Sequence, residues 1–230
     1  FTNSYGAYRE IYAMKGDGRR ARLEDCEFPS SALTYVVSPY AVGVDAFGCV
    51  ATNCTGFFAY IQTPSSFTDC LVAGNGGEAQ FDIVASGATP VGITNCVVVQ
   101  NRSMGIRLNV TTALSVSVSH CTIADNETTA TKAGGGVYFN TANNRITDSI
   151  VHGNLNFGVP ADITLAGTAP APTRCCFGEA DEEDGNGNIA SDPLFADPAA
   201  RDYALLPSSP CIDAGAAVGP PVRDIAGAAR

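Results

Sequence analysis

Hydrophobic and polar residues alternate over short stretches of this chain, and the alternation breaks at regular points. In residues 114–119, one leucine and two valines alternate with serines, the period of two that is typical of a half-buried β-strand. The phase then changes, because Val118 and His120 share one parity whereas Cys121 and Ile123 form the next apolar pair. The pattern therefore predicts a bend near His120 between two short strands.

This pattern recurs along most of the chain at a nearly fixed interval. The positions equivalent to Cys121 lie 21–28 residues apart and are Ser4, Cys26, Cys49, Cys70, Cys96, Ser149 and Cys175. Cys49 is assigned by spacing, and Cys54 fits the local motif equally well. The interval is too short for the helix pairs of ankyrin or armadillo repeats, and it suits one coil of three short strands. The sequence thus predicts an all-β fold, a parallel β-solenoid of about eight coils.

Polar residues mark two corners of each predicted coil. The first-corner row, beside the motif cysteines, comprises Asp69, Asn95, His120 and Asp148, and the second-corner row comprises Asn75, Asn101, Asn126 and Asn154. Asn and Asp suit such corners because they tolerate left-handed backbone angles and hydrogen-bond nearby backbone groups. A third strand is expected after the second corner, at residues 80–83, 105–108, 136–139 and 161–163.

The repeat ends near residue 178, and the composition changes there. Residues 179–192 are rich in acidic residues and Asn, and Pro and Ala become frequent beyond them. Stacked coils expose strand edges only at their ends, and these ends need caps. We therefore expect a β-solenoid over residues 1–178 and an irregular C-terminal cap over residues 179–230. Residues 1–4 already match the motif, so the chain is expected to begin within the array.

The net charge of −10 argues against two classes of partner. Nucleic acids and anionic membrane surfaces both attract basic proteins, and no apolar run reaches the roughly 20 residues of a transmembrane helix. Most of the nine cysteines follow the repeat interval, which predicts a buried row of reduced thiols that pack as small hydrophobic groups. No CxxC or histidine-containing spacing indicates zinc.

The repeat motif and the C-terminal segment both resemble a known group of proteins. The motif Ile-x-Asn-Cys-x-Val-x-x-Asn, which spans residues 67–154, resembles the right-handed parallel β-helix superfamily with the pectate-lyase-like fold. Residues 187–195, 201–205 and 208–215 are similar to the C-terminal region of bacterial surface β-helix proteins of the choice-of-anchor Q type, which resemble polymorphic outer-membrane proteins in their repeats. The resemblance implies a right-handed single-stranded parallel β-helix in a secreted or cell-surface bacterial protein. It implies no particular activity, because this fold carries lyases, glycosidases, adhesins and passive stalks.

The first-corner row could supply acid–base chemistry, but its geometry favours a structural role. His120 would lie one coil from Asp148, about 5 Å away. Asp69 and Asp148 would lie three coils apart, on the order of 14 Å, which exceeds the roughly 5–10 Å between the carboxylates of glycosidases. We therefore interpret the row as corner residues that hydrogen-bond stacked backbone, and we assign no catalytic residue.

The third strands offer a candidate carbohydrate-binding row. Asp82, Arg107, Tyr138 and Asp162 each fall between inward-facing neighbours and should point outward on successive coils. An acid, a cation, an aromatic ring and a second acid could hold a sugar chain. The resemblance implies that Arg107 could also act as the base of a polysaccharide lyase, although arginine is hard to deprotonate. The alternative is ordinary solvent-facing strand residues, whose opposite charges give modest support.

The acidic segment after the array offers oxygen ligands for calcium, which takes six to eight of them. The candidate ligands are Asp181, Asp184, Asn186, Asn188 and Asp192. A solvated acidic turn is the alternative, because Ile189 occupies the position at which an EF-hand loop requires glycine. Calcium is the only cofactor that the sequence suggests.

Three cysteines lie at or beyond the end of the array. A disulfide between Cys211 and either Cys175 or Cys176 would tie the cap to the last coil, which suits an extracellular protein. The alternative is three independent thiols.

Three functional classes follow from these features. We expect a non-catalytic extracellular or cell-surface module that is structural, adhesive or filament-forming, with a neighbouring β-helix or a second copy as its partner. A carbohydrate-binding module is the first alternative. The second is a lyase or hydrolase that acts on an extracellular polysaccharide.

Overall fold

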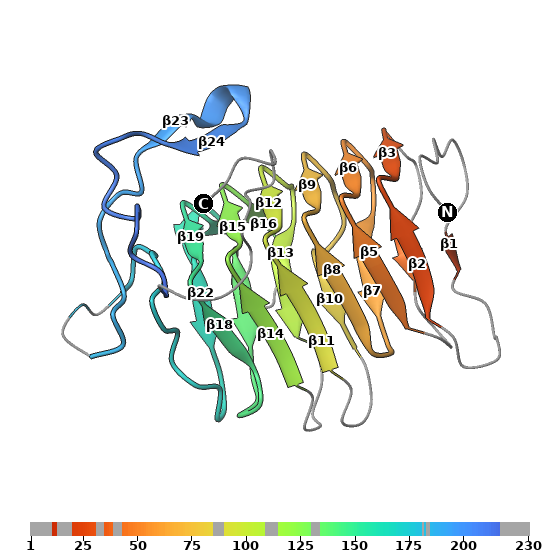
Figure 1. Ribbon diagram of the computed structural model, residues 1–230, viewed down its shortest axis with the longest axis horizontal. Coiled ribbons are helices and arrows are strands. Elements are labelled where there is room, and N and C mark those ends of the chain that lie inside the picture. Colours follow the sequence, from red (N-terminus) through yellow and green to blue (C-terminus); the bar gives the residue numbers. More distant parts are fainter. Residues whose placement is uncertain are drawn as a thin grey trace.

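The chain winds into coils of short β-strands that are stacked side by side along one axis (Figure 1). The computed structural model describes residues 11–12, 20–30, 35–38, 43–84, 90–108, 115–129, 134–180, 182 and 185–216. Within these residues, one 3-10 turn, η1 (Pro198–Ala200), accompanies the strands, and no helix is long and apolar enough to span a membrane.

Three parallel sheets form the sides of the coils. The first sheet contains β2 (Ala21–Glu24), β5 (Val44–Phe47), β8 (Ser65–Thr68), β11 (Pro90–Thr94), β14 (Ser115–Ser119) and β18 (Arg145–Thr147). The second sheet contains β3 (Glu27–Pro29), β6 (Val50–Thr52), β9 (Leu71–Ala73), β12 (Val97–Val99), β15 (Thr122–Ala124) and β19 (Ile150–His152). The third sheet contains β1 (Ile11–Tyr12), β4 (Tyr35–Ser38), β7 (Phe57–Ile61), β10 (Ala79–Ile83), β13 (Met104–Leu108), β17 (Val137–Phe139) and β22 (Ile163–Leu165).

This arrangement confirms the all-β parallel solenoid and slightly reduces its coil count. The sheets hold six, six and seven strands, fewer than the eight coils expected. One expected copy, at Ser4, lies outside the described residues. Another, at Cys175, contributes only isolated parallel bridges, in which Thr173 pairs with Thr147 and Cys176 with Ile150.

The ambiguity between Cys49 and Cys54 is resolved by strand register. Val50, directly after Cys49, pairs with Glu27 in β3 and with Leu71 in β9, so Cys49 is the equivalent of Cys26 and Cys70. Cys54 instead lies at the second corner, where its backbone N–H donates to Asn75 Oδ1 at 2.8 Å.

The interior of the coil is filled by apolar side chains from all three sheets. The rings of Phe58, Phe67 and Phe81 are fully buried and pack edge to face, with centroids 5.1–5.9 Å apart. The predicted row of buried, reduced cysteines is confirmed at Cys26, Cys49, Cys70, Cys96, Cys121 and Cys175. Each thiol donates to the carbonyl two residues earlier, as from Cys96 to Thr94 at 3.3 Å.

The first corner turns through one residue in the left-handed region, as the phase shift in the sequence predicts. The φ angles are 56° at Asp69, 52° at Asn95, 55° at His120 and 51° at Asp148. L-residues adopt this conformation at a cost, and Asn and Asp reduce that cost by local hydrogen bonding.

The chain continues to stack beyond residue 178. The N–H of Arg174 donates to Asn186 O at 2.9 Å, that of Phe177 to Ile189 O at 3.0 Å, and that of Ile189 back to Cys175 O at 2.8 Å. A hairpin follows, built from β23 (Phe195–Asp197), η1 and β24 (Asp202–Leu205). A small sheet of β16 (Glu127–Thr128), β20 (Leu155–Asn156) and β21 (Val159–Pro160) lies beside the array. The division of the chain into a solenoid over residues 1–178 and a cap over residues 179–230 stays a prediction. The hydrogen bonds of Asn186 and Ile189 show that a partial coil follows residue 178.

Candidate functional site

The most regular polar feature is a ladder of buried asparagines at the second corner. Its members are at most 1% exposed and are Asn75, Asn101, Asn126 and Asn154. Asn126 shows the repeating unit: its Oδ1 accepts from the backbone N–H of Asn101 at 3.1 Å and from Asn101 Nδ2 at 2.8 Å. Its Nδ2 donates to Val98 O at 2.9 Å and to Asn154 Oδ1 at 2.8 Å. The amides of Asn101 and Asn126 therefore each join the coil before them to the coil after them.

Asp162 terminates this ladder and does not join the row predicted on the third strands. Its Oδ1 accepts from the N–H and the Nδ2 of Asn154 at 2.8 and 3.0 Å, and its Oδ2 accepts from the N–H of Gly178 at 3.0 Å. The residue paired with Tyr138 is Thr164. The expected position of Asp162 beside Tyr138 is thus corrected, because the hairpin of β20 and β21 shifts the count of residues in this coil.

The remaining members of the third-strand row are adjacent, but two of them are buried. Asp82 pairs with Arg107, and Arg107 pairs with Tyr138. Arg107 donates through Nε and Nη2 to the two carboxylate oxygens of Asp82 at 2.8 and 2.7 Å, and through Nη1 to Glu78 Oε2 at 2.6 Å. Asp82 and Arg107 are 2% and 4% exposed, so the expectation that they face solvent is wrong.

This ion pair fixes the protonation state of Arg107. Burial alone would lower the pKa of Arg107, but the hydrogen bonds and negative charges of Asp82 and Glu78 outweigh burial and raise the pKa above its ordinary value. A guanidinium held in this way stays protonated and cannot accept a proton from a substrate. The geometry therefore does not support Arg107 as a lyase base.

The first-corner row is also occupied by contacts between coils. Asn95 Nδ2 donates to Asp69 Oδ1 at 2.6 Å. Arg174 donates through Nε and Nη2 to the two oxygens of Asp148 at 2.6 and 3.0 Å, and the N–H of Ala216 adds a bond at 2.8 Å. The hydrogen bond from Arg174 is the main cause that lowers the pKa of Asp148 to about 2. These contacts agree with the interpretation of the row as structural corner residues.

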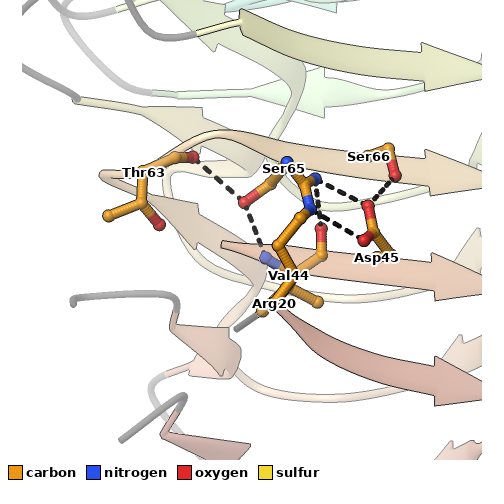
Figure 2. A network of polar contacts seen from close by, with 6 residues as sticks. All are labelled: Arg20, Val44, Asp45, Thr63, Ser65 and Ser66. Atoms are coloured by element: carbon orange, nitrogen blue, oxygen red, sulfur yellow. Dashed lines mark hydrogen bonds and ion pairs between the residues drawn. The ribbon is translucent and has the colours of Figure 1, made fainter. Parts of the chain in front are cut away.

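A polar network on the first sheet was not predicted from the sequence (Figure 2). Arg20 donates through Nε and Nη2 to the carboxylate oxygens of Asp45 at 2.7 and 2.6 Å, and Ser66 on the next strand donates to the same carboxylate. In the same network, Ser65 Oγ accepts from the N–H of Val44 at 3.2 Å. The network therefore joins the residue before β2 to two successive strands.

A row of hydroxyl side chains continues along the outer face of the first sheet. Strand register aligns Thr68, Thr94, Ser119, Thr147 and Thr173. All five side chains are half-buried, and each directly precedes a first-corner residue. A signal for this row was present in the sequence, because a hydroxyl residue precedes the corner in these five copies, whereas the two copies before them carry Glu24 and Phe47 at this position.

The C-terminal hairpin lies against the second corner through two polar side chains. Arg201 donates through Nε to Gln100 Oε1 at 3.0 Å and through Nη2 to Asn53 Oδ1 at 3.2 Å. The hydroxyl of Tyr203 donates to Asp125 Oδ2 at 2.7 Å. One hairpin thus hydrogen-bonds residues at three of four successive second corners, those that follow β6, β12 and β15.

The same hairpin covers apolar surface on the second sheet. The rings of Phe195 and Tyr203 pack edge to face, with centroids 4.9 Å apart, and contact a small buried cluster of Ala73, Val99 and Ala124. Gly74 lies beneath Arg201 with a φ of 70°, and an added Cβ would lie 2.4 Å from Arg201 Nη2 and 2.6 Å from Asn53 Oδ1, so a side chain here would displace the contact between Arg201 and Asn53. The family resemblance of the C-terminal segment did not indicate that this hairpin folds back on the array.

A family model described as "Right handed beta helix region" matches residues 11–162, about two thirds of the chain. The chain belongs to this family. No curated protein and no solved structure gives a match. The family assignment fixes the hand of the solenoid and leaves its activity open, because function lies in sites and not in the fold.

The described part of the acidic segment of this β-helix protein serves to hold its own backbone. Asn188 is 5% exposed; its Oδ1 accepts from the N–H of Cys175 at 2.9 Å, and its Nδ2 donates to Pro172 O at 3.0 Å. Asp192 accepts from the N–H of Leu194 at 2.8 Å. Asp181 and Asp184 lie outside the described residues, and no group of three potential metal ligands occurs within those residues. Calcium binding stays a prediction.

The three C-terminal cysteines of the β-helix are reduced in this structure and have distinct surroundings. Cys175 faces the core, and its thiol donates to Thr173 O at 3.4 Å. The Cys176 thiol donates to Ser191 O at 3.2 Å, and Ser209, which accepts from the N–H of Cys211, donates to Pro193 O, so both cysteines lie beside residues 191–193; each thiol is also the main influence on the pKa of the other. Of the two partners considered for Cys211, the structure therefore favours Cys176.

Proposed function

We propose that this β-helix is a non-catalytic structural module of a secreted or cell-surface protein, with an adhesive or filament-forming role. The proposal rests on one observation: the charged side chains that resemble a reactive site bind one another between coils. Arg107 holds Asp82 and Glu78, and Arg174 holds Asp148. Such contacts stiffen a stack in which each coil touches only its neighbours.

A panel of extracellular polysaccharides tests this proposal directly. The purified chain is incubated with each polysaccharide, and binding and released oligosaccharides are measured together. We expect no released product from the wild-type chain. Product release that the Arg107→Lys variant abolishes, while its far-UV circular dichroism spectrum stays unchanged, would replace the structural role by an enzymatic one.

Carbohydrate binding is the second candidate, and strand register favours it. Tyr60 pairs with Asp82, and Tyr138 pairs with Arg107, so two half-buried tyrosines flank the ion pair on four successive coils. Aromatic rings at this spacing suit contact with an extended sugar chain. The Tyr138→Ala variant should then lose glycan binding in the same panel, whereas Tyr203→Phe, on the C-terminal hairpin, should retain it. If Tyr138→Ala binds glycans as well as Tyr203→Phe does, the third-strand row is not a carbohydrate-binding site.

A further inference from the structure

Cys176 on the last coil and Cys211 on the C-terminal segment both lie beside residues 191–193, through Ser191 O and through Ser209 on Pro193 O. Cys176 forms parallel bridges with Ile150 on one side and Ile189 on the other, which places it within the final stack. Its N–H donates to Ser149 O at 2.9 Å, and its thiol donates to Ser191 O at 3.2 Å. The backbone on either side of Cys176 is therefore fixed by stacking.

Cys211 is held in place by contacts on both sides of it. Its N–H donates to Ser209 Oγ at 3.2 Å, and the same hydroxyl donates to Pro193 O. Five residues beyond Cys211, the N–H of Ala216 donates to Asp148 Oδ1 at 2.8 Å. Cys211 is half-buried whereas Cys176 is buried, so reagents in solution reach Cys211 first.

We infer that Cys176 and Cys211 form an intramolecular disulfide that fastens the C-terminal segment to the last coil. The oxidant is a low-molecular-weight disulfide such as oxidised glutathione. The thiolate of Cys211 attacks one sulfur of that disulfide and releases one glutathione thiolate. The thiolate of Cys176 then attacks the Cys211 sulfur of the mixed disulfide and releases the second. The two cysteines lose two protons and two electrons, and one glutathione disulfide becomes two thiols.

The two thiols differ in the way that this order of attack requires. The side-chain interaction with Cys176 is the main cause that lowers the pKa of Cys211, and the Ser209 hydroxyl acts in the same direction. The same contact with Cys211, together with burial, raises the pKa of Cys176. The thiolate is the nucleophile in exchange, so Cys211, which is less buried and more acidic than Cys176, reacts with the external disulfide.

Three serine variants of the full chain provide matched tests of this disulfide. Cys211→Ser and Cys176→Ser each remove one partner. Cys175→Ser is the control, because it changes the adjacent thiol to the residue that the array itself carries at the equivalent position, Ser149. Each protein is incubated with oxidised glutathione, free thiols are blocked with N-ethylmaleimide before unfolding, and peptides are mapped by mass spectrometry without reduction.

A peptide containing Cys211 should be linked to the peptide that begins after Arg174 in the wild-type chain and in Cys175→Ser. The link should be absent from Cys176→Ser. Oxidation should raise the melting temperature of the first two proteins and leave that of Cys211→Ser unchanged. The inference is overturned if Cys211 is recovered only with N-ethylmaleimide or glutathione attached, or if Cys175→Ser loses the link while Cys176→Ser keeps it. These outcomes do not depend on the polysaccharide panel.

Discussion

Replacing Asn126 with alanine removes four hydrogen bonds from the middle of the asparagine ladder. The side chain is fully buried, accepts two bonds from Asn101 and donates one each to Val98 and Asn154. At about 1 kcal/mol net for each bond, the loss is about 4 kcal/mol in the free energy of unfolding. At the end of the ladder, the Asn75 side chain makes two such bonds, to the Cys54 N–H and Ala51 O, so Asn75→Ala should cost about 2 kcal/mol.

Urea unfolding followed by far-UV circular dichroism measures both losses. Because a stacked array need not unfold in two states, hydrogen exchange of backbone amides in the native protein provides a local reading. Exchange should increase most at the N–H of Asn101, which donates to the deleted Asn126 oxygen. Asn143, an exposed turn residue, supplies a control whose alanine variant should change stability by less than about 0.5 kcal/mol. Equal losses for Asn126→Ala and Asn75→Ala, or a loss below about 1 kcal/mol for Asn126→Ala, would refute the argument.

Three further predictions concern the ion pairs and the hairpin. Arg107→Met leaves the Asp82 carboxylate buried without its cation and should cost about 3–5 kcal/mol in urea unfolding; a loss below about 1 kcal/mol would contradict the pair. The pKa of Asp148 is about 2 in the folded protein and about 3.9 in the unfolded chain. Ionised Asp148 therefore adds to the free energy of unfolding above pH 4, and this stabilisation is lost as the pH falls toward 2. In Asp148→Asn, the melting temperature should fall less between pH 4 and pH 2 than it does in the wild-type chain. An equal fall in both proteins would argue against this role of Asp148. Tyr203→Phe removes the hydrogen bond to Asp125 and should speed tryptic cleavage within the hairpin; equal cleavage rates would show that the bond does not hold it.

The corners of the coil could be predicted because their signal is local. The change of phase at His120 requires only the residues around it, and the left-handed φ of 55° at this position confirms the bend. The spacing of the asparagines was visible for the same reason. What the spacing could not show is that their side chains are buried and bond one another, because that depends on contacts between residues about 25 positions apart.

The contents of the third-strand row could be predicted only in part, because the loops before it vary in length. The interval from ladder asparagine to row residue is 6 residues from Asn101 to Arg107 and 12 from Asn126 to Tyr138. Alternation within residues 161–163 placed Asp162 beside Tyr138 although strand pairing places Thr164 there, and counting from the ladder could not have corrected this, because the interval is not constant. Periodicity in sequence reports register only where every coil has the same length.

The same stacking explains why a β-helix contains rows that imitate active sites. Equivalent residues on adjacent coils lie about 4.8 Å apart, so an acid and a base in one row meet at hydrogen-bonding distance. Asp82 with Arg107 and Asp148 with Arg174 are in contact for this reason. Reaction with a substrate instead requires space between the groups, as between the two carboxylates of glycosidases. A row whose members touch is thus evidence for stability, and chemistry is expected where a row has a gap.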